Sequence, residues 1–337
     1  MNLTNQKYAK FALVREMLET TEVVRKFDPA VATAYGEKAK TKKGLFLTGE
    51  GSSRIFPAKR AMYDNLKWGA PLSIFTEGST QAMEYALKDL AIFGASNSGQ
   101  TKEVIRLFMK LQEEKHDALF GLTATQGTKL ASLTHASHVL NCGKEDAVAA
   151  TKSVIEQGLF YDAVIRIMTG KPIDVFSSLP SQIEKALTLE IDPKIVQAAS
   201  HADMIYFAGR NNGVVEELTL KTNEITRKKS DFLEGTYAVH GIEEVMDKNE
   251  VVIIVEPFES EEEKFRQCLV KGVGMKVIAI SSRQTSFPTV IIPDGGNLSS
   301  YVELAAGWNL LVDIGLALGI DLDKPVRARK IGNEYTL

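Results

Sequence analysis

Short apolar runs alternate with longer segments of helical periodicity along most of this 337-residue chain. The runs at 44–49, 89–93 and 118–122 have the length and composition of buried strands. Buried strands that are separated by helices predict a parallel sheet with helices on both faces. We therefore expect an α/β fold of the doubly wound, flavodoxin-like class.

The same succession of strands and helices begins again near residue 183. Further strands are predicted at 72–75, 138–140, 204–207, 251–255, 276–280 and 290–292. Helices are predicted at 8–26, 29–40, 52–66, 102–111, 148–168, 183–201, 214–228 and 301–318. The repetition predicts N-terminal helices over 1–40, one domain over 41–172, a related domain over 173–319 and a C-terminal tail over 320–337.

The segment Ala95–Thr101 joins a predicted strand to a predicted helix and is rich in hydroxyl side chains. Backbone N–H groups and the positive end of the helix dipole converge at such a helix start. Ser96, Ser98 and Thr101 would add side-chain donors at the same point. The pattern predicts a site for an anion, most simply a phosphate, although a turn that only caps the helix fits the spacing equally well.

The charge balance excludes several classes of partner. A net charge of -3 and a pI near 6.1 leave no broad basic field for nucleic acid or an anionic membrane. Only two cysteines occur, Cys142 and Cys268, so neither a disulfide framework nor a thiolate zinc site is expected. With no signal peptide and no membrane-spanning run, the sequence predicts a cytoplasmic protein.

The sequence does not complete the motifs of a dinucleotide site, a nucleotide-binding kinase or a metal site. The Gly49-Glu50-Gly51 turn only superficially suggests a dinucleotide site, because Arg54 stands where the third glycine is needed. No Gly-Lys-Ser/Thr loop of a nucleotide-binding kinase is present. His135 and His138 have a spacing that could share a metal ion, but no carboxylate or cysteine stands close by in the sequence. We expect neither a metal nor a cofactor.

Six segments resemble, in order and approximate spacing, one family of tandem sugar isomerase (SIS) proteins, the isomerase half of the glutamine–fructose-6-phosphate aminotransferases. They are Gly51–Ser53, Ser96–Thr101, Glu145–Lys152, Leu220–Ile225, His240–Gly241 and Asp321–Lys330. The resemblance covers most of the chain and implies two tandem SIS domains that bind a sugar 6-phosphate. The residues that it assigns to phosphate or substrate binding are Ser53, Ser96, Asn97, Ser98, Thr101, Glu145 and Val148.

The same resemblance implies four catalytic residues. Glu224 would move a proton between C1 and C2 of the sugar, and Lys221 lies one helical turn earlier, where it can face the same pocket. His240 would open the sugar ring, work that suits an imidazole near neutral pH. Lys330 would form a Schiff base with the open-chain ketose. Taken alone, each of these residues could equally be a solvated or structural side chain.

The sequence departs from the family in ways that bear on the reaction. No glutaminase half precedes the first helices, Ile242 replaces a proline after the His-Gly pair, and Ala150 replaces a serine near the sugar. We therefore expect an aldose–ketose isomerase that acts on an aminosugar 6-phosphate and deaminates it, of the glucosamine 6-phosphate to fructose 6-phosphate type. The alternatives are a fructosamine-6-phosphate deglycase and a non-catalytic SIS module that only binds a sugar phosphate. The resemblance also implies a homodimer in which His240 reaches the neighbouring subunit's site.

Overall fold

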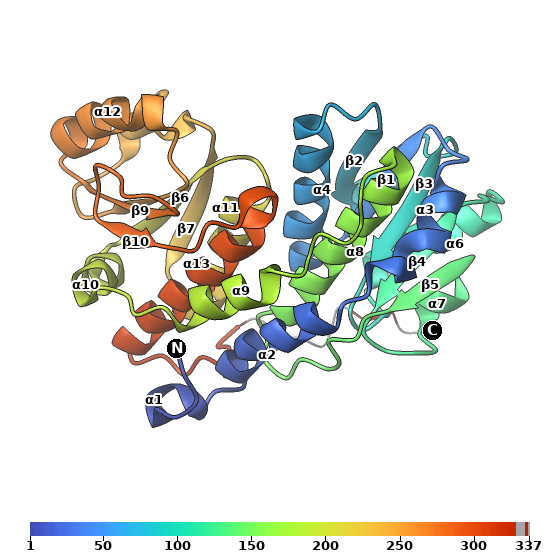
Figure 1. Cartoon of the computed structure of the whole chain (residues 1–337), viewed down its shortest axis with the longest axis horizontal. Coiled ribbons are helices and arrows are strands. Elements are labelled where there is room, and N and C mark those ends of the chain that lie inside the picture. The colour runs from blue at the N-terminus through green and yellow to red at the C-terminus, as the bar shows by residue number, and fades with distance from the viewer. Residues whose placement is uncertain (328–333, 336–337) are drawn as a thin grey trace. The chain divides into compact units, whose positions relative to one another are not determined.

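The computed structural model describes residues 1–327 and 334–335 (Figure 1). These residues form two compact units, each built around one sheet. The first-sheet unit comprises residues 22–146, 150–177 and 334–335, and the second-sheet unit comprises residues 1–21, 147–149 and 178–327. Within the described ranges, no helix has the length and apolar character needed to cross a membrane.

The first-sheet unit contains five parallel strands in the order β2-β1-β3-β4-β5. Their bounds are β1 Gly44–Gly49, β2 Ser73–Gly78, β3 Leu90–Ala95, β4 Leu119–Thr123 and β5 Ala136–Val139. The order reverses between β1 and β3, since the chain moves outward from β1 to β2 and returns to the other side for β3. Ligands of doubly wound sheets bind at such a reversal, beyond the carboxyl ends of the strands.

The segments that connect these strands form helices because apolar residues recur in them at helical spacing. In α6, Val104, Phe108 and Leu111 lie on one face and are buried against β3 and β4. Each such side chain contributes about 1.5–3 kcal/mol to folding. The α-helices between residues 1 and 177 are α1 Gln6–Ala9, α2 Ala12–Lys26, α3 Thr33–Ala39, α4 Ile55–Lys67, α5 Ser79–Ala82, α6 Lys102–Glu113, α7 Lys129–Ser132 and α8 Lys152–Thr169. Of these, α1 and the first part of α2 belong to the second-sheet unit. Short 3₁₀ turns lie at Pro29–Ala32 and Gly51–Ser53.

The second-sheet unit repeats this topology, with five parallel strands in the order β10-β9-β8-β6-β7. Their bounds are β6 Met204–Gly209, β7 Lys229–Glu234, β8 Val251–Val255, β9 Lys276–Ser281 and β10 Thr289–Ile291. The reversal falls between β6 and β8, which correspond to β1 and β3. The α-helices are α9 Leu179–Thr188, α10 Pro193–His201, α11 Val214–Lys221, α12 Glu262–Phe265 and α13 Ser299–Ala317. Two π-helical segments follow at Thr222–Thr226 and Arg266–Val273, and short 3₁₀ turns lie at Tyr237–Val239, Ile242–Val245, Glu259–Glu261 and Gly296–Leu298.

Two parallel, helix-covered sheets of identical strand order confirm the expected tandem α/β fold. The helix predicted over 183–201 is wrong as a single element, because the chain breaks before Pro193, where Asp192 caps the new helix through Lys194 N at 2.8 Å. Strand β7 was not predicted. Its sequence places lysine, aspartate and glutamate among apolar residues, as an edge strand can do.

Candidate functional site

The loop Ser96–Thr101 lies where the predicted anion site requires it, between the carboxyl end of β3 and the first turn of α6. The hydroxyl oxygens of Ser96 and Thr101 are 2.7 Å apart, and no side chain caps the first-turn N–H groups of α6. Those groups and the helix dipole therefore point at the space above the loop. Gly99 makes the turn possible, since its φ is +61° and a Cβ there would lie 2.3 Å from Thr128.

A second layer of polar side chains supports this loop. The buried carboxylate of Glu145 accepts hydrogen bonds from Thr151 N at 2.7 Å, from Asn97 Nδ2 at 3.1 Å and from the hydroxyl of Ser153. Gln157 Nε2 donates to Asn97 Oδ1 at 2.9 Å. The amide of Asn97 is therefore fixed from both ends. Glu145 therefore orients Asn97.

The other residues that were predicted to bind phosphate or substrate, Ser53, Ser98 and Val148, lie in different places. Ser53 is half-buried in the turn after β1, with its hydroxyl 3.5 Å from Gln157 Nε2. Ser98 is exposed, and its hydroxyl accepts from Gln100 N at 3.2 Å. Val148 is half-buried in the segment 147–149, which belongs to the second-sheet unit. The first-sheet unit therefore brings together Ser53, Ser96, Asn97, Ser98, Thr101 and Glu145, but not Val148.

A buried ion cluster occupies the end of α11 in the second-sheet unit. Lys221 is fully buried, and its Nζ lies 2.7 Å from Glu224 Oε2 and 3.2 Å from Glu217 Oε1. Burial alone would lower the pKa of Lys221, but the carboxylates of Glu224 and Glu217 outweigh it and raise that pKa above its usual value. The lysine is therefore held as an ammonium, and it fixes the position of the Glu224 carboxylate.

Glu224 is the member of this cluster that reaches a pocket. It lies in the π-helical turn Thr222–Thr226, where the widened backbone breaks the α-helical register. Its side chain is 22% exposed, whereas Lys221 and Glu217 are 0% exposed. A cavity of about 530 Å³ is lined by Glu224 and by residues of the C-terminal segment up to Arg327. A carboxylate at the wall of a cavity can act as a base toward a bound molecule.

His240 is not joined to this cluster by any hydrogen bond or ion pair within residues 1–327 and 334–335. It is exposed at the end of a 3₁₀ turn, and its Nε2 lies 3.0 Å from Lys264 Nζ on α12. Lys330 lies outside the described residues. The chain just after it is placed, because Glu334 forms an isolated bridge with Thr101 and Tyr335 N donates to Gln100 O at 2.8 Å.

The two histidines considered for a metal have other surroundings. His138 lies on β5 and stacks on Phe160 with ring centroids 4.8 Å apart, and burial lowers its pKa. His135 Nδ1 accepts from Leu119 N at 3.0 Å. Among the residues that the structure describes, no group of three or more histidine, cysteine, aspartate or glutamate side chains could hold a metal ion.

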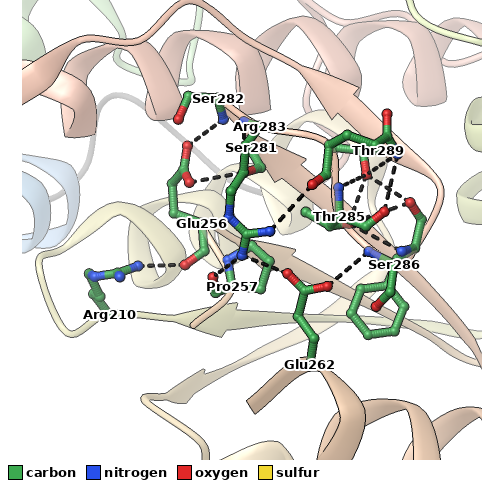
Figure 2. Close-up of polar contacts among 12 residues, drawn as sticks. Arg210, Glu256, Pro257, Glu262, Ser281, Ser282, Arg283, Thr285, Ser286 and Thr289 are labelled. Atoms are coloured by element: carbon green, nitrogen blue, oxygen red, sulfur yellow. Dashed lines mark hydrogen bonds and ion pairs between the residues drawn. The ribbon is translucent and has the colours of Figure 1, made fainter. Parts of the chain in front are cut away.

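The loop after β8 corresponds in topology to Ser96–Thr101, and Glu256 at its start makes hydrogen bonds to the end of β9 (Figure 2). The carboxylate of Glu256 accepts from Ser281 Oγ at 2.9 Å and from Ser282 N. Arg210 donates to the carbonyl oxygen of Glu256. Glu256 has a φ of +45°, an uncommon conformation for a residue with a Cβ.

An ion pair lies beside the loop after β8, which is called the second loop below. Arg283 lies 2.6 Å from Glu262 Oε1 and donates to Pro257 O at 2.9 Å, while Ser286 N donates to Glu262 Oε2 at 2.8 Å (Figure 2). The carboxylates of Glu256 and Glu262 thus accept hydrogen bonds from Ser281, Ser282 and Ser286, at and after the end of β9.

Three residues of the candidate site were not found from the sequence. Glu217 lies four residues before Lys221 on α11, a spacing that places two side chains on one helix face. This spacing was a usable signal. Ser153 and Gln157 recur at the same spacing on α8, but only the fold shows that this face meets Asn97.

Comparison with known proteins agrees with this geometry. Residues 38–167 match the SIS domain family. Glutamine–fructose-6-phosphate aminotransferase [isomerizing] 1 of Arabidopsis thaliana is 24% identical over 182 residues, which are 50% of this chain and 26% of that protein, so the chain spans about a quarter of its length. The C-terminal domain of glucosamine–fructose-6-phosphate aminotransferase from Francisella tularensis superposes with a TM-score of 0.79 at 18% identity, covering 95% of this chain and 100% of that one. Glucosamine-6-phosphate deaminase from Thermotoga maritima superposes with a TM-score of 0.75 at 19% identity, covering 96% and 99%.

Proposed function

We propose that this chain, which carries a SIS domain at residues 38–167 and has the tandem SIS fold over its length, is a sugar-phosphate isomerase. Its substrate would be an amino-sugar 6-phosphate from which the amine is released. In the simplest case, glucosamine 6-phosphate and water give fructose 6-phosphate and ammonia. The observation that carries the proposal is Glu224 at the wall of a cavity, with its carboxylate 2.7 Å from the ammonium of a fully buried Lys221.

The phosphate end of the substrate is assigned to Ser96–Thr101. Hydroxyls of Ser96, Ser98 and Thr101 and the first-turn N–H groups of α6 can all donate to phosphate oxygens. Asn97 is held by Glu145 and Gln157 at the back of the loop. These donors suit a dianion without requiring a metal or a basic residue in the loop.

Glu224 would act at the other end of the sugar. Its carboxylate takes the proton from C2 of the open-chain aldose and returns it to C1, so that C2 is oxidised and C1 is reduced within one molecule. The resulting C2 imine is hydrolysed by water, which breaks the C–N bond and releases the amine. Lys221 remains protonated throughout and keeps the carboxylate in place. The reaction has no net redox change and needs no redox cofactor.

His240 and Lys330 are proposed for the steps before and after this transfer. His240 would move a proton to the ring oxygen, and Lys330 would attack the open-chain ketose. Glu334, four residues after Lys330 in the sequence, forms an isolated bridge with Thr101.

Exchange of the substrate's C1 or C2 proton with solvent deuterium tests the proposal. Glu224→Gln should bind sugar phosphate as the wild type does but exchange the proton about 10²–10⁴-fold more slowly, because the base is lost. Glu216→Gln, a neighbouring change on α11, is the control and should exchange normally. Undiminished exchange in Glu224→Gln would remove Glu224 from the mechanism and leave Glu234 as the next carboxylate to examine.

We also propose that the active form is a homodimer in which His240 serves the partner's site. Mixing inactive Glu224→Gln with inactive His240→Ala under subunit exchange should then restore about a quarter of wild-type activity. Half of the dimers are mixed, and each mixed dimer has one complete site of two. Background activity, with exchange verified by mass, would show that the site is not shared.

A further inference from the structure

The two loops at the strand reversal of the first-sheet unit are joined by the buried side chain of Gln157 on α8. One loop follows β1 and carries Ser53, and the other follows β3 and carries Asn97. Gln157 is 0% exposed, and its Nε2 lies 2.9 Å from Asn97 Oδ1. The same Nε2 lies 3.5 Å from Ser53 Oγ, at the outer limit of a hydrogen bond. One amide nitrogen therefore faces both loops.

The direction of each hydrogen bond in this network is set by Glu145. Its carboxylate oxygens only accept, so Asn97 must turn its Nδ2 toward Glu145, at 3.1 Å, and its Oδ1 away. The second Nδ2 proton of Asn97 goes to Ser153 Oγ at 2.6 Å, and that hydroxyl donates to Glu145 in turn. Asn97 Oδ1 then needs a donor, which fixes Gln157 with its Nε2 toward Asn97.

The fixed orientation leaves Gln157 Oε1 without a hydrogen-bond partner among the described residues, although this oxygen is buried. A buried acceptor without a donor destabilises a folded protein. Turning the amide over would relieve Oε1 only by pointing it at Asn97 Oδ1, so that two acceptors would face each other. The observed orientation is therefore kept at a cost to stability, as is typical of side chains that serve a site.

Ser53 receives its direction from the same amide. A hydroxyl has one proton, and because the Ser53 oxygen accepts from Gln157, that proton is free for another acceptor. Ser53 follows β1, which pairs with β3, and β3 leads into Ser96–Thr101. An anion at this reversal would therefore meet the proton of the Ser53 hydroxyl rather than its lone pairs.

We propose that Gln157 is a positioning residue for the phosphate group of the substrate. It turns the Ser53 proton toward the anion and holds the Asn97 side chain in place. The inference rests on the proposed function, which assigns the phosphate to Ser96–Thr101. Phosphate oxygens accept from the protein, so a hydroxyl that presents its oxygen instead of its proton weakens their binding.

Glucitol 6-phosphate is the probe, because it has no carbonyl group and cannot be isomerised. Its affinity is measured by calorimetry on the full-length protein. Gln157→Met removes the Nε2 donor and should weaken binding about tenfold or more, the size of one hydrogen bond to a charged group. Gln157→Glu keeps the shape of the side chain but turns an acceptor toward Asn97 and Ser53. It should therefore bind the probe more weakly still.

Gln182→Met is the matched control. Gln182 lies on α9 in the second-sheet unit, where its Nε2 donates to Asp294 O at 2.8 Å. Its Oε1 is likewise buried and without a hydrogen-bond partner among the described residues. Gln182→Met should leave the affinity for glucitol 6-phosphate within about twofold of the wild type. Equal losses of affinity in Gln182→Met and Gln157→Met overturn the inference.

Three readouts separate positioning from a structural role. In a Ser53→Ala background, Gln157→Met should weaken binding less than about threefold, because the hydroxyl that it orients is gone. With glucosamine 6-phosphate as substrate, Gln157→Met should raise KM about tenfold and keep kcat within about twofold. Its urea midpoint should fall no further than that of Gln182→Met. Losses that multiply in the double variant, an equal fall in kcat, or failure of both Gln157 variants to fold would each overturn the inference.

Failure of the proposed function would look different. The wild type would then not bind glucitol 6-phosphate, or Ser96→Ala with Thr101→Ala would bind it as the wild type does. Weakened binding by that double variant with unchanged binding by both Gln157 variants keeps the proposed phosphate site and rejects this inference. The predicted dependence on Gln157, in a wild type that exchanges no proton of any amino-sugar phosphate, supports this inference and rejects the proposed reaction.

Discussion

The loops after β3 and after β8 lie at the same position of two sheets with the same strand order, yet their side chains differ in charge. Ser96–Thr101 has hydroxyls, a glycine and uncapped helix N–H groups, and none of its residues is charged. The loop after β8 carries Glu256 and Glu262, whose carboxylates occupy the surrounding donors. The first loop thus has no charged side chain, whereas the carboxylates at the second accept hydrogen bonds from the segment at and after the end of β9.

The two loops keep the same place in a repeated architecture although their side chains differ. In both loops the first backbone N–H continues the sheet, since Ser96 N donates to Leu122 O at 2.9 Å and Glu256 N donates to Ile280 O at 2.8 Å. The next donors differ in what they meet. In the second loop the Glu256 carboxylate accepts from Ser281 Oγ and Ser282 N, so it joins the end of β8 to the end of β9.

The largest expected effect comes from removing the hydroxyls of the first loop. Ser96→Ala with Thr101→Ala should weaken binding of a sugar 6-phosphate by roughly 3–6 kcal/mol, because two hydrogen bonds to a charged group are lost. Calorimetric titration with glucose 6-phosphate measures the change. The stability of the free protein should change far less than the affinity.

Ser281→Ala, at the end of β9 beside the second loop, is the matched control. It removes a buried hydroxyl that bonds Glu256 and should leave sugar-phosphate affinity unchanged. If both changes weakened binding equally, or if neither did, the contrast between the two loops would be lost. Binding of one sugar phosphate per chain in the wild type is a further requirement of the contrast.

The first loop was predictable because its signal is local. A buried strand, a turn rich in hydroxyls and an amphipathic helix are all readable between residues 90 and 113, and backbone geometry then fixes where the N–H groups point. Lys221 and Glu224 were assigned through the family resemblance, and their three-residue spacing predicts that the two side chains come together, as they do at 2.7 Å.

The second loop and the supports of the first were not predictable, because they depend on contacts between distant residues. Glu256 meets Ser281, 25 positions away, and Gln157 meets Asn97, 60 positions away. A glutamate after a strand gives no sign in the sequence that its carboxylate will bond a serine at the end of another strand. The prediction of one helix over 183–201 was wrong for a local reason. Apolar residues recur at helical spacing on both sides of the Asp192-Pro193 pair, where a second helix begins.

A smaller effect tests the backbone of the first loop. Gly99→Ala should destabilise the protein by roughly 2–5 kcal/mol, because it combines left-handed strain with a Cβ placed 2.3 Å from Thr128. Gly127→Ala is the control, since Gly127 has a φ of +66° with nothing within 4 Å of an added Cβ, and about 1–2 kcal/mol is expected. Urea unfolding gives both values. Equal losses would mean that contact with Thr128 does not constrain the loop.

The smallest effect is a pH response confined to the second loop. Burial alone would raise the pKa of Glu262, but hydrogen bonds from Ser286 and Arg283 outweigh it and place that pKa below the usual 4.5. The stabilising contribution of Glu262 is therefore present above pH 4.5 and is lost as the pH falls through the lower pKa of the folded protein. The amide NMR signal of Ser286, which donates to Glu262 at 2.8 Å, should shift in that acid range. In Glu262→Gln this pH-dependent shift should disappear. The same transition in the variant would assign the response to another carboxylate, and the ion pair between Glu262 and Arg283 would then not explain it.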